Sequence, residues 1–144
     1  MGNHQTKNVR INFEDMQHAM TTHPKYTIIN TLPENEQQCL IKHTIPAQQE
    51  EVTVNRCIET RKTYCPIIIY GKNTNDLAVL QKHDQLVKMG FTQVYLYPGG
   101  LFEWLTLQDI YGKQEFPTTS DELDLLKYKP HRVLHDHLIE YRSY

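Results

Sequence analysis

Four successive apolar residues, Ile67–Tyr70, constrain the fold of this chain more than any other feature of its sequence. Apolar side chains at consecutive positions are typical of a strand that is buried on both faces of a parallel sheet. A polar loop follows, and residues 77–88 then place leucine and valine side chains at helical spacing. Gly90 suits the left-handed residue that often ends a helix, and Val94–Tyr97 predicts the next strand. This β-loop-α-β order predicts two parallel strands joined by a helix.

The rest of the chain supplies further elements of both kinds. The patterns predict a short helix over 14–20, a strand over 26–30, a loop-like segment over 32–49, an ambiguous and helix-compatible segment over 52–61, and a helix over 101–111. We therefore predict an α/β fold in which a central, mainly parallel sheet of about five strands is flanked by helices on both faces. Residues 1–10 are predicted to form a flexible tail, 11–119 a single domain, and 120–144 a helical extension.

Composition narrows the classes of function. The chain has 144 residues and a net charge of −2, and it shows no basic patch with interleaved aromatic residues, so nucleic acid is not an expected partner. We expect no transmembrane segment, because no run of 18 apolar residues occurs. The start of the chain also lacks the pattern of a secretory signal peptide. A cytoplasmic location is the resulting expectation.

The three cysteines, Cys39, Cys57 and Cys65, form an odd set. Without a secretion signal, an odd set favours reduced thiols. No two of them have the short spacing of a zinc motif, and no metal or other cofactor is predicted. His131 and His135, near Asp136 and His137, would share a helix face as metal ligands do, but a solvated helix is the favoured interpretation.

Three segments in order resemble the active-site region of the rhodanese (thiosulfate sulfurtransferase) family. They are the strand Ile67–Tyr70, the helix exit at Gly90-Phe91, and the segment that runs from Gly99-Gly100 to Trp104. A weaker likeness lies near His43, where Ile45-Pro46-Ala47 resembles the family's His-Ile-Pro-Gly-Ala segment with an extra residue and no glycine. The resemblance covers about residues 11–119 and implies a rhodanese-like domain there.

The resemblance places the family's nucleophilic cysteine on the residue directly after the first strand, which here is Gly71. The family's thiolate lies in a cup of backbone N–H groups that lower its pKa and hold anionic oxygens. The loop in that place is Gly71-Lys72-Asn73-Thr74-Asn75-Asp76. Asp76 is expected to cap the following helix and to put negative charge at the mouth of the anion site. Asn30-Thr31-Leu32 stands where many members of the family carry Asp-x-Arg.

A family-like frame with glycine in the nucleophile position favours a catalytically inactive domain that binds or scaffolds a protein partner. Two alternatives stay open. The first is an active sulfurtransferase, or a related phosphatase or arsenate reductase, that uses a displaced cysteine such as Cys39. The second is a structural subunit of a larger assembly, in which 120–144 packs on a neighbour.

Two further patterns bear on partners. Gly2 with Thr6 matches the N-myristoylation motif, although one acyl chain binds a membrane only marginally and a second signal would be needed. Tyr111, Phe116 and Pro117 either pin the chain to the domain, which is favoured, or form an aromatic docking patch.

Overall fold

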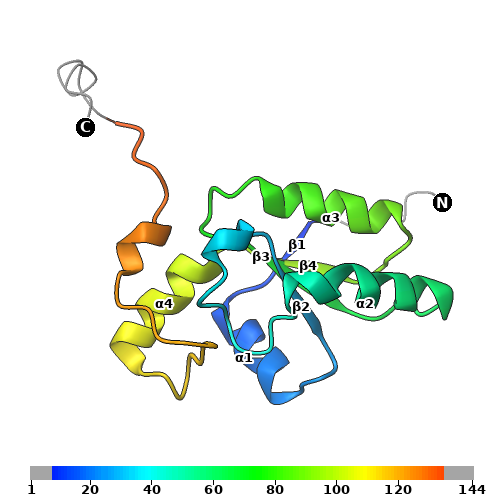
Figure 1. Cartoon of the computed structure of the whole chain (residues 1–144), viewed down its shortest axis with the longest axis horizontal. Helices are drawn as coiled ribbons and strands as arrows, with labels where there is room; N and C mark the ends of the chain where they lie inside the picture. Colours follow the sequence, from blue (N-terminus) through cyan, green and yellow to red (C-terminus); the bar gives the residue numbers. More distant parts are fainter. Residues whose placement is uncertain (1–7, 135–144) are drawn as a thin grey trace.

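The computed structural model describes residues 8–134, and within them the chain forms a four-stranded parallel sheet in the order β1-β4-β3-β2. The elements are β1 (Val9–Arg10), α1 (Phe13–Thr21), β2 (Thr27–Asn30), the 3₁₀ turn η2 (Glu34–Glu36), α2 (Ala47–Glu59), β3 (Ile67–Tyr70), α3 (Ala78–Lys88), β4 (Val94–Tyr97), α4 (Gly100–Tyr111) and the 3₁₀ turn η3 (Leu125–Tyr128). The predicted parallel α/β fold is confirmed, and Figure 1 shows the helices packed around the sheet.

Two separate apolar cores explain why β3 is apolar at every position. Ile68 and Tyr70 face a core that includes residues of α1 and α4. Ile67 and Ile69 face the other core, which includes residues of α2 and α3. Successive side chains of a strand point to opposite faces of the sheet, so a strand covered on both faces must be apolar throughout. The predicted placement of helices on both faces is therefore confirmed.

The described residues contain four strands instead of the expected five or so. The segment after η2 reaches the free edge of β2 but pairs with it through a single bridge, Ile28 to Thr44. The Ile45 N–H donates to the Ile28 carbonyl oxygen at 2.9 Å. Because α2 begins at Ala47, directly after Pro46, the chain turns into a helix before a ladder can form. α2 also starts earlier than the helix expected within 52–61.

The sheet begins inside the segment that was expected to be a flexible tail. Val9 and Arg10 pair with Tyr95 and Leu96 of β4, and the Ile11 N–H donates to the Leu96 carbonyl oxygen at 2.8 Å. Both side chains are exposed, so this two-residue strand shows no run of buried apolar residues in the sequence. Backbone pairing places them in the sheet; residues 1–7 lie outside the described range.

Residues 113–128, called the C-terminal arm here, return along α4 to the carboxyl edge of the sheet (Figure 1). Of the helical extension expected over 120–144, the structure describes residues 120–134, which contain one 3₁₀ turn, η3, and are not helical over 129–134. Tyr128, at the end of the arm, is only 1% exposed and belongs to the core on the α1 and α4 side. The arm is thus packed as part of the domain as far as Tyr128, and residues 135–144 lie outside the described range.

Candidate functional site

The ends of three neighbouring strands meet at the loop formed by residues 71–76. This loop follows β3, Thr31 follows β2, and Gly99 with Gly100 follows β4. All the strands are parallel, so these segments lie at the same edge of the sheet. Ligands of open α/β sheets bind at that edge, in the crevice outside the carboxyl ends of the strands. The 71–76 loop is therefore the candidate site on topological grounds.

Gly100 allows the loop to lie directly against the start of α4. Its φ is +67°, and a Cβ atom there would lie 2.6 Å from the Gly71 carbonyl oxygen. The Leu101 N–H donates to that oxygen at 2.9 Å, and the Phe102 N–H donates to the Lys72 carbonyl oxygen at 3.0 Å. Only glycine combines this conformation with so close an approach. The N–H groups of Leu101 and Phe102, at the start of α4, therefore donate to the loop and not to a ligand.

The Asp76 carboxylate occupies the space that a side chain at residue 71 would need. A Cβ atom built on Gly71 would collide with Asp76 Oδ2, and it would lie 2.7 Å from both Asp76 Cγ and Val79 Cγ2. Gly71 is itself buried. Glycine and aspartate are therefore sterically matched, because a side chain at residue 71 would require the Asp76 carboxylate and Val79 to shift from their present positions.

Three donors hold this carboxylate. Asp76 Oδ2 accepts from the Lys72 backbone N–H at 2.9 Å and from the Thr31 hydroxyl at 3.1 Å. Asp76 Oδ1 accepts from the Ala78 backbone N–H at 3.0 Å, at the start of α3. Anions that bind at a loop and the start of a helix accept hydrogen bonds from the same kinds of donor, backbone N–H groups and hydroxyls. Asp76 acts as a built-in anion, inside the loop and not only at its mouth.

Asp76 was expected to cap α3, and it does bond to the first residue of this helix although it lies one residue before the N-cap position. α3 begins at Ala78 and its N-cap position is Leu77, which has no side-chain cap. The bond from the Ala78 N–H to Asp76 nevertheless satisfies one of the free donors at the start of α3.

The surroundings of the 71–76 loop leave little room for a ligand. Lys72 Nζ lies 2.9 Å from Glu36 Oε1, so its charge is paired with η2. The cavity beside the loop, whose lining includes Arg10 and Leu77, has a volume of about 80 Å³. Sites for small molecules are usually about 300–1,000 Å³. This cavity is too small to enclose a typical small-molecule ligand.

The C-terminal arm supports the loop from the side. Asn73 Nδ2 donates to the Tyr128 carbonyl oxygen at 2.8 Å, and Asn73 Oδ1 accepts from the Asn75 N–H at 2.9 Å. The roles of Tyr128 and of the Thr31 hydroxyl at this site were not predicted from the sequence. No local pattern marks either one, because Tyr128 lies 55 positions from Asn73 and Thr31 lies 45 positions from Asp76.

The segment with the weaker family likeness packs near this edge through Tyr70. The Ile41 N–H donates to the Tyr70 hydroxyl oxygen at 3.1 Å, and Thr44 Oγ1 lies 2.7 Å from the same oxygen. Burial raises the pKa of Tyr70 well above its ordinary value. Tyr70 therefore holds residues 41–44 as a neutral phenol. His43 instead stacks on His23 at 3.9 Å between ring centroids.

Cys39, the proposed substitute nucleophile, is enclosed by the C-terminal arm. It is 1% exposed, and its thiol donates to the Ser120 carbonyl oxygen at 3.2 Å. Burial raises the pKa of the Cys39 thiol despite hydrogen bonds to Thr118 and Ser120. Because the thiolate is the nucleophile and a substrate must reach it, this environment opposes catalysis.

The remaining candidates of the sequence analysis do not meet at the loop. Phe116 is buried and packs at 5.0 Å from the Trp104 ring, as the pinning interpretation predicted, whereas Tyr111 is exposed. His131 is exposed in a non-helical segment; Gly2, His135, Asp136 and His137 lie outside the described residues. Over residues 8–134 there is no cluster of three or more metal-binding side chains and no helix long and apolar enough to span a membrane.

The fold defines a class of protein when it is compared with known structures. No protein family and no curated protein matches the sequence. The crystal structure of the Alr3790 protein of Anabaena sp. is similar, with a TM-score of 0.56 and 20% identity over 81% of this chain and 97% of that one. The rhodanese-like domain of the same protein in solution gives a TM-score of 0.53 and 19% identity over 91% and 98%.

A third similar structure comes from another organism. The BH2092 protein of Bacillus halodurans gives a TM-score of 0.56 and 17% identity over 69% of this chain and 72% of that one. At such identities the likeness concerns the fold. The chain is an α/β protein with a parallel sheet, and its fold is rhodanese-like.

Proposed function

We propose that this protein is a non-catalytic rhodanese-like domain that acts as a binding module for a protein partner. The Asp76 carboxylate carries the proposal, because it fills the place of the residue 71 side chain and accepts three hydrogen bonds there. Covalent sulfur transfer needs a nucleophile at the loop, and Gly71 supplies none. An external anion would also have to displace a carboxylate that is already bound by the same donors.

The absence of sulfur transfer is the first expected result. With thiosulfate as donor and cyanide as acceptor, the purified full-length protein should form no thiocyanate above the uncatalysed rate. Intact mass after thiosulfate treatment should show no added sulfur. Turnover that is lost in Cys39→Ser, with persulfide on Cys39, would overturn the proposal and establish the alternative of a displaced nucleophile.

The same mass measurement on protein from its native host tests the proposed lipid anchor. Myristate on Gly2 would add a single acyl chain, and peripheral membrane contact from a cytoplasmic location would then need a second signal.

A binding role requires an exposed surface, and α4 with the C-terminal arm supplies apolar side chains. η3 packs against α4. The exposed large apolar residues of α4 and the C-terminal arm are Ile110, Tyr111, Leu123 and Leu126. Leu123 is 92% exposed, which is high for a large apolar side chain. Apolar side chains gathered on neighbouring elements suit a protein contact, so we propose this surface as the one that meets the partner.

Leu123→Ser with Leu126→Ser should reduce capture of the partner from extracts of the native host at least about tenfold, as expected for the loss of about 1.4 kcal/mol or more of binding free energy. Leu77→Ser is the matched control, because Leu77 is 69% exposed but lies beside the 71–76 loop. If Leu77→Ser abolishes capture and the double variant does not, the loop face is the binding surface. A captured partner that stays bound in fixed ratio through purification would favour the alternative of a structural subunit.

A further inference from the structure

Two imidazole rings lie face to face where the turn after α1 meets the segment after η2. The rings of His23 and His43 are stacked, with 3.9 Å between their centroids and 7° between their planes. His43 belongs to residues 41–45, called the edge segment here, which reach the free edge of β2. His23 is exposed and His43 is half-buried, so both rings can exchange protons with solvent.

The backbone of His43 adopts a conformation that only surrounding contacts can hold. Its φ is +71°, in the left-handed region that residues other than glycine rarely adopt. The Lys42 N–H donates to the Pro117 carbonyl oxygen at 3.1 Å, and the Ile45 N–H donates to the Ile28 carbonyl oxygen at 2.9 Å. These bonds hold the edge segment on both sides of His43. The stack adds a contact from the His43 side chain itself, to the turn after α1.

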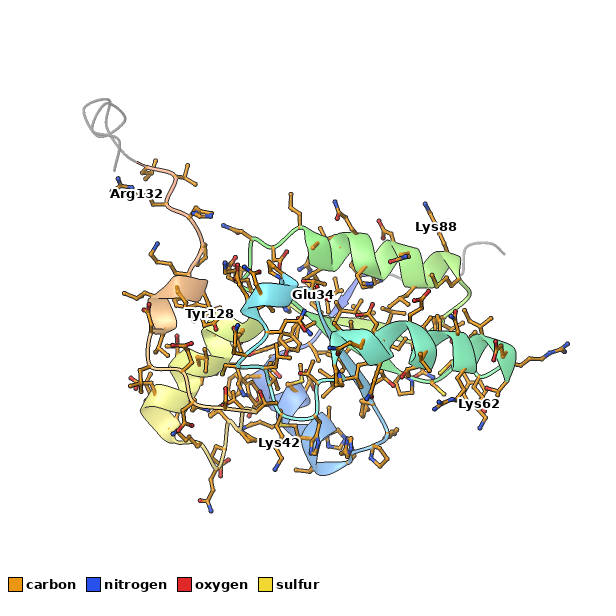
Figure 2. All side chains as sticks on the ribbon, in the orientation of Figure 1. Glu34, Lys42, Lys62, Lys88, Tyr128 and Arg132 are labelled. Atoms are coloured by element: carbon orange, nitrogen blue, oxygen red, sulfur yellow. The ribbon has the colours of Figure 1, made fainter. Side chains whose placement is uncertain are left out.

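The groups around the stack decide how many protons it can hold. A cavity of about 480 Å³ lies beside His43, between α1 and the C-terminal arm. The titratable and charged side chains that line it are Glu14, His18, Lys42, His43 and Glu115. Figure 2 labels Lys42, which lies close to α1, and Lys25 follows two positions after His23. The carboxylates favour a first proton on the pair, whereas the lysines and the ring already charged oppose a second one.

We propose that the stack of His23 and His43 is an acid-sensitive contact, which holds the edge segment to the turn after α1 at neutral pH and opens when both rings are protonated. Two unit charges about 4 Å apart repel each other, and this repulsion changes the equilibrium between closed and open forms by about fivefold or more. Groups that interact so closely gain their protons in two separate steps, which belong to the pair. The contact does not depend on the proposed binding role.

The sign of the pH dependence follows from the environment of His43. Burial first, and then the charges of His23 and Lys42, lower the pKa of His43 below its ordinary value of 6.5. The open form therefore binds more protons than the closed form just below pH 6.5. The stability of the stack is complete above that pH and is lost as the pH falls below it. Acidification from neutral pH is thus the signal that opens the contact.

Amide hydrogen exchange, measured by NMR on the full-length protein, tests this inference. The protection factor of the Ile45 N–H should fall at least about fivefold from about pH 8 to about pH 5, the range in which histidine titrates. The Ile67 N–H, which donates to the Gln93 carbonyl oxygen inside the sheet, is the reference and should keep its protection. The ring C–H signals of His23 and His43 should titrate in two separate steps.

Three variants supply the matched controls. His43→Asn removes the imidazole but keeps a residue that tolerates the left-handed conformation, and His23→Gln removes the partner ring at an exposed position. Both should lose the fall in Ile45 protection, and the pKa of His43 should rise in His23→Gln. His18→Gln, which removes the other histidine of the cavity, should retain the fall.

Circular dichroism at neutral pH checks that each variant is folded. The inference is overturned if Ile45 protection in the unaltered protein does not change with pH, or if it falls equally with the Ile67 reference. It is also overturned if the fall persists in folded His23→Gln, or if it is lost in His18→Gln.

Discussion

Gly71→Cys combined with Asp76→Ala should react with iodoacetamide at least about tenfold faster at pH 7 than Gly71→Cys alone, which corresponds to a difference of about one unit in the pKa of the new thiol. In the single variant the new side chain collides with the Asp76 carboxylate and Val79, and the carboxylate opposes formation of a thiolate beside it. Removing the carboxylate leaves the Lys72 and Ala78 N–H groups free to stabilise the thiolate. The rate is measured by mass spectrometry in a Cys65→Ser background, because Cys65 shares the tryptic peptide of residue 71.

Asp76→Asn separates charge from size in this experiment. With Gly71→Cys it keeps a side chain of the same volume but removes the negative charge. If the negative charge is the main cause of slow reaction, Gly71→Cys with Asp76→Asn should react nearly as fast as Gly71→Cys with Asp76→Ala. If the steric collision is the main cause, its rate should stay near that of Gly71→Cys alone. Equal rates in all three would contradict the assignment of Asp76 as the built-in anion of the loop.

Tyr128→Ala should lower the free energy of unfolding by about 3–5 kcal/mol, the usual range for removing a large aromatic side chain from a core. The reason is that Tyr128 is 1% exposed and packs in the core on the α1 and α4 side. Its loss also loosens the end of the arm whose carbonyl oxygen accepts from Asn73. Urea unfolding followed by the fluorescence of Trp104, the single tryptophan, measures the change.

Tyr128→Phe is the matched control, because it removes only the hydroxyl group. That oxygen is buried and has no hydrogen-bond partner among the described residues. Removing a buried polar group that has no partner removes an unfavourable desolvation term, so Tyr128→Phe should be neutral or stabilising. A loss of stability on Tyr128→Phe would mean that the hydroxyl has a partner, and an unchanged stability of Tyr128→Ala would mean that the arm is not part of the core.

The burial of Tyr128 limits which C-terminal residues can be deleted to test a role in assembly. Deleting 120–144, the extension expected from sequence, would remove the core side chain of Tyr128. A loss of assembly could then result from unfolding of the domain. Residues from Pro130 onward follow the last buried residue of the arm, so a deletion of 130–144 leaves the described core intact.

The parallel sheet and its two covered faces could be predicted from Ile67–Tyr70 because burial on both sides requires an apolar side chain at every position. The helix over 78–88 and the strand over 94–97 could also be predicted from the sequence, since local patterns of apolar residues mark them. The strand Val9–Arg10 could not be predicted, because it is formed by backbone pairing with β4 and its side chains are exposed.

By itself, the sequence determined that residue 71 carries no nucleophile, because this follows from the identity of one residue and its place after a strand. Only the tertiary structure decided what takes that place. The Asp76 carboxylate turns inward because Thr31, Lys72 and Ala78 present donors to it, and these donors come from separate segments of the chain. A sequence records an aspartate near a helix start, whereas the direction of its side chain depends on hydrogen bonds that exist only once the strand ends have met.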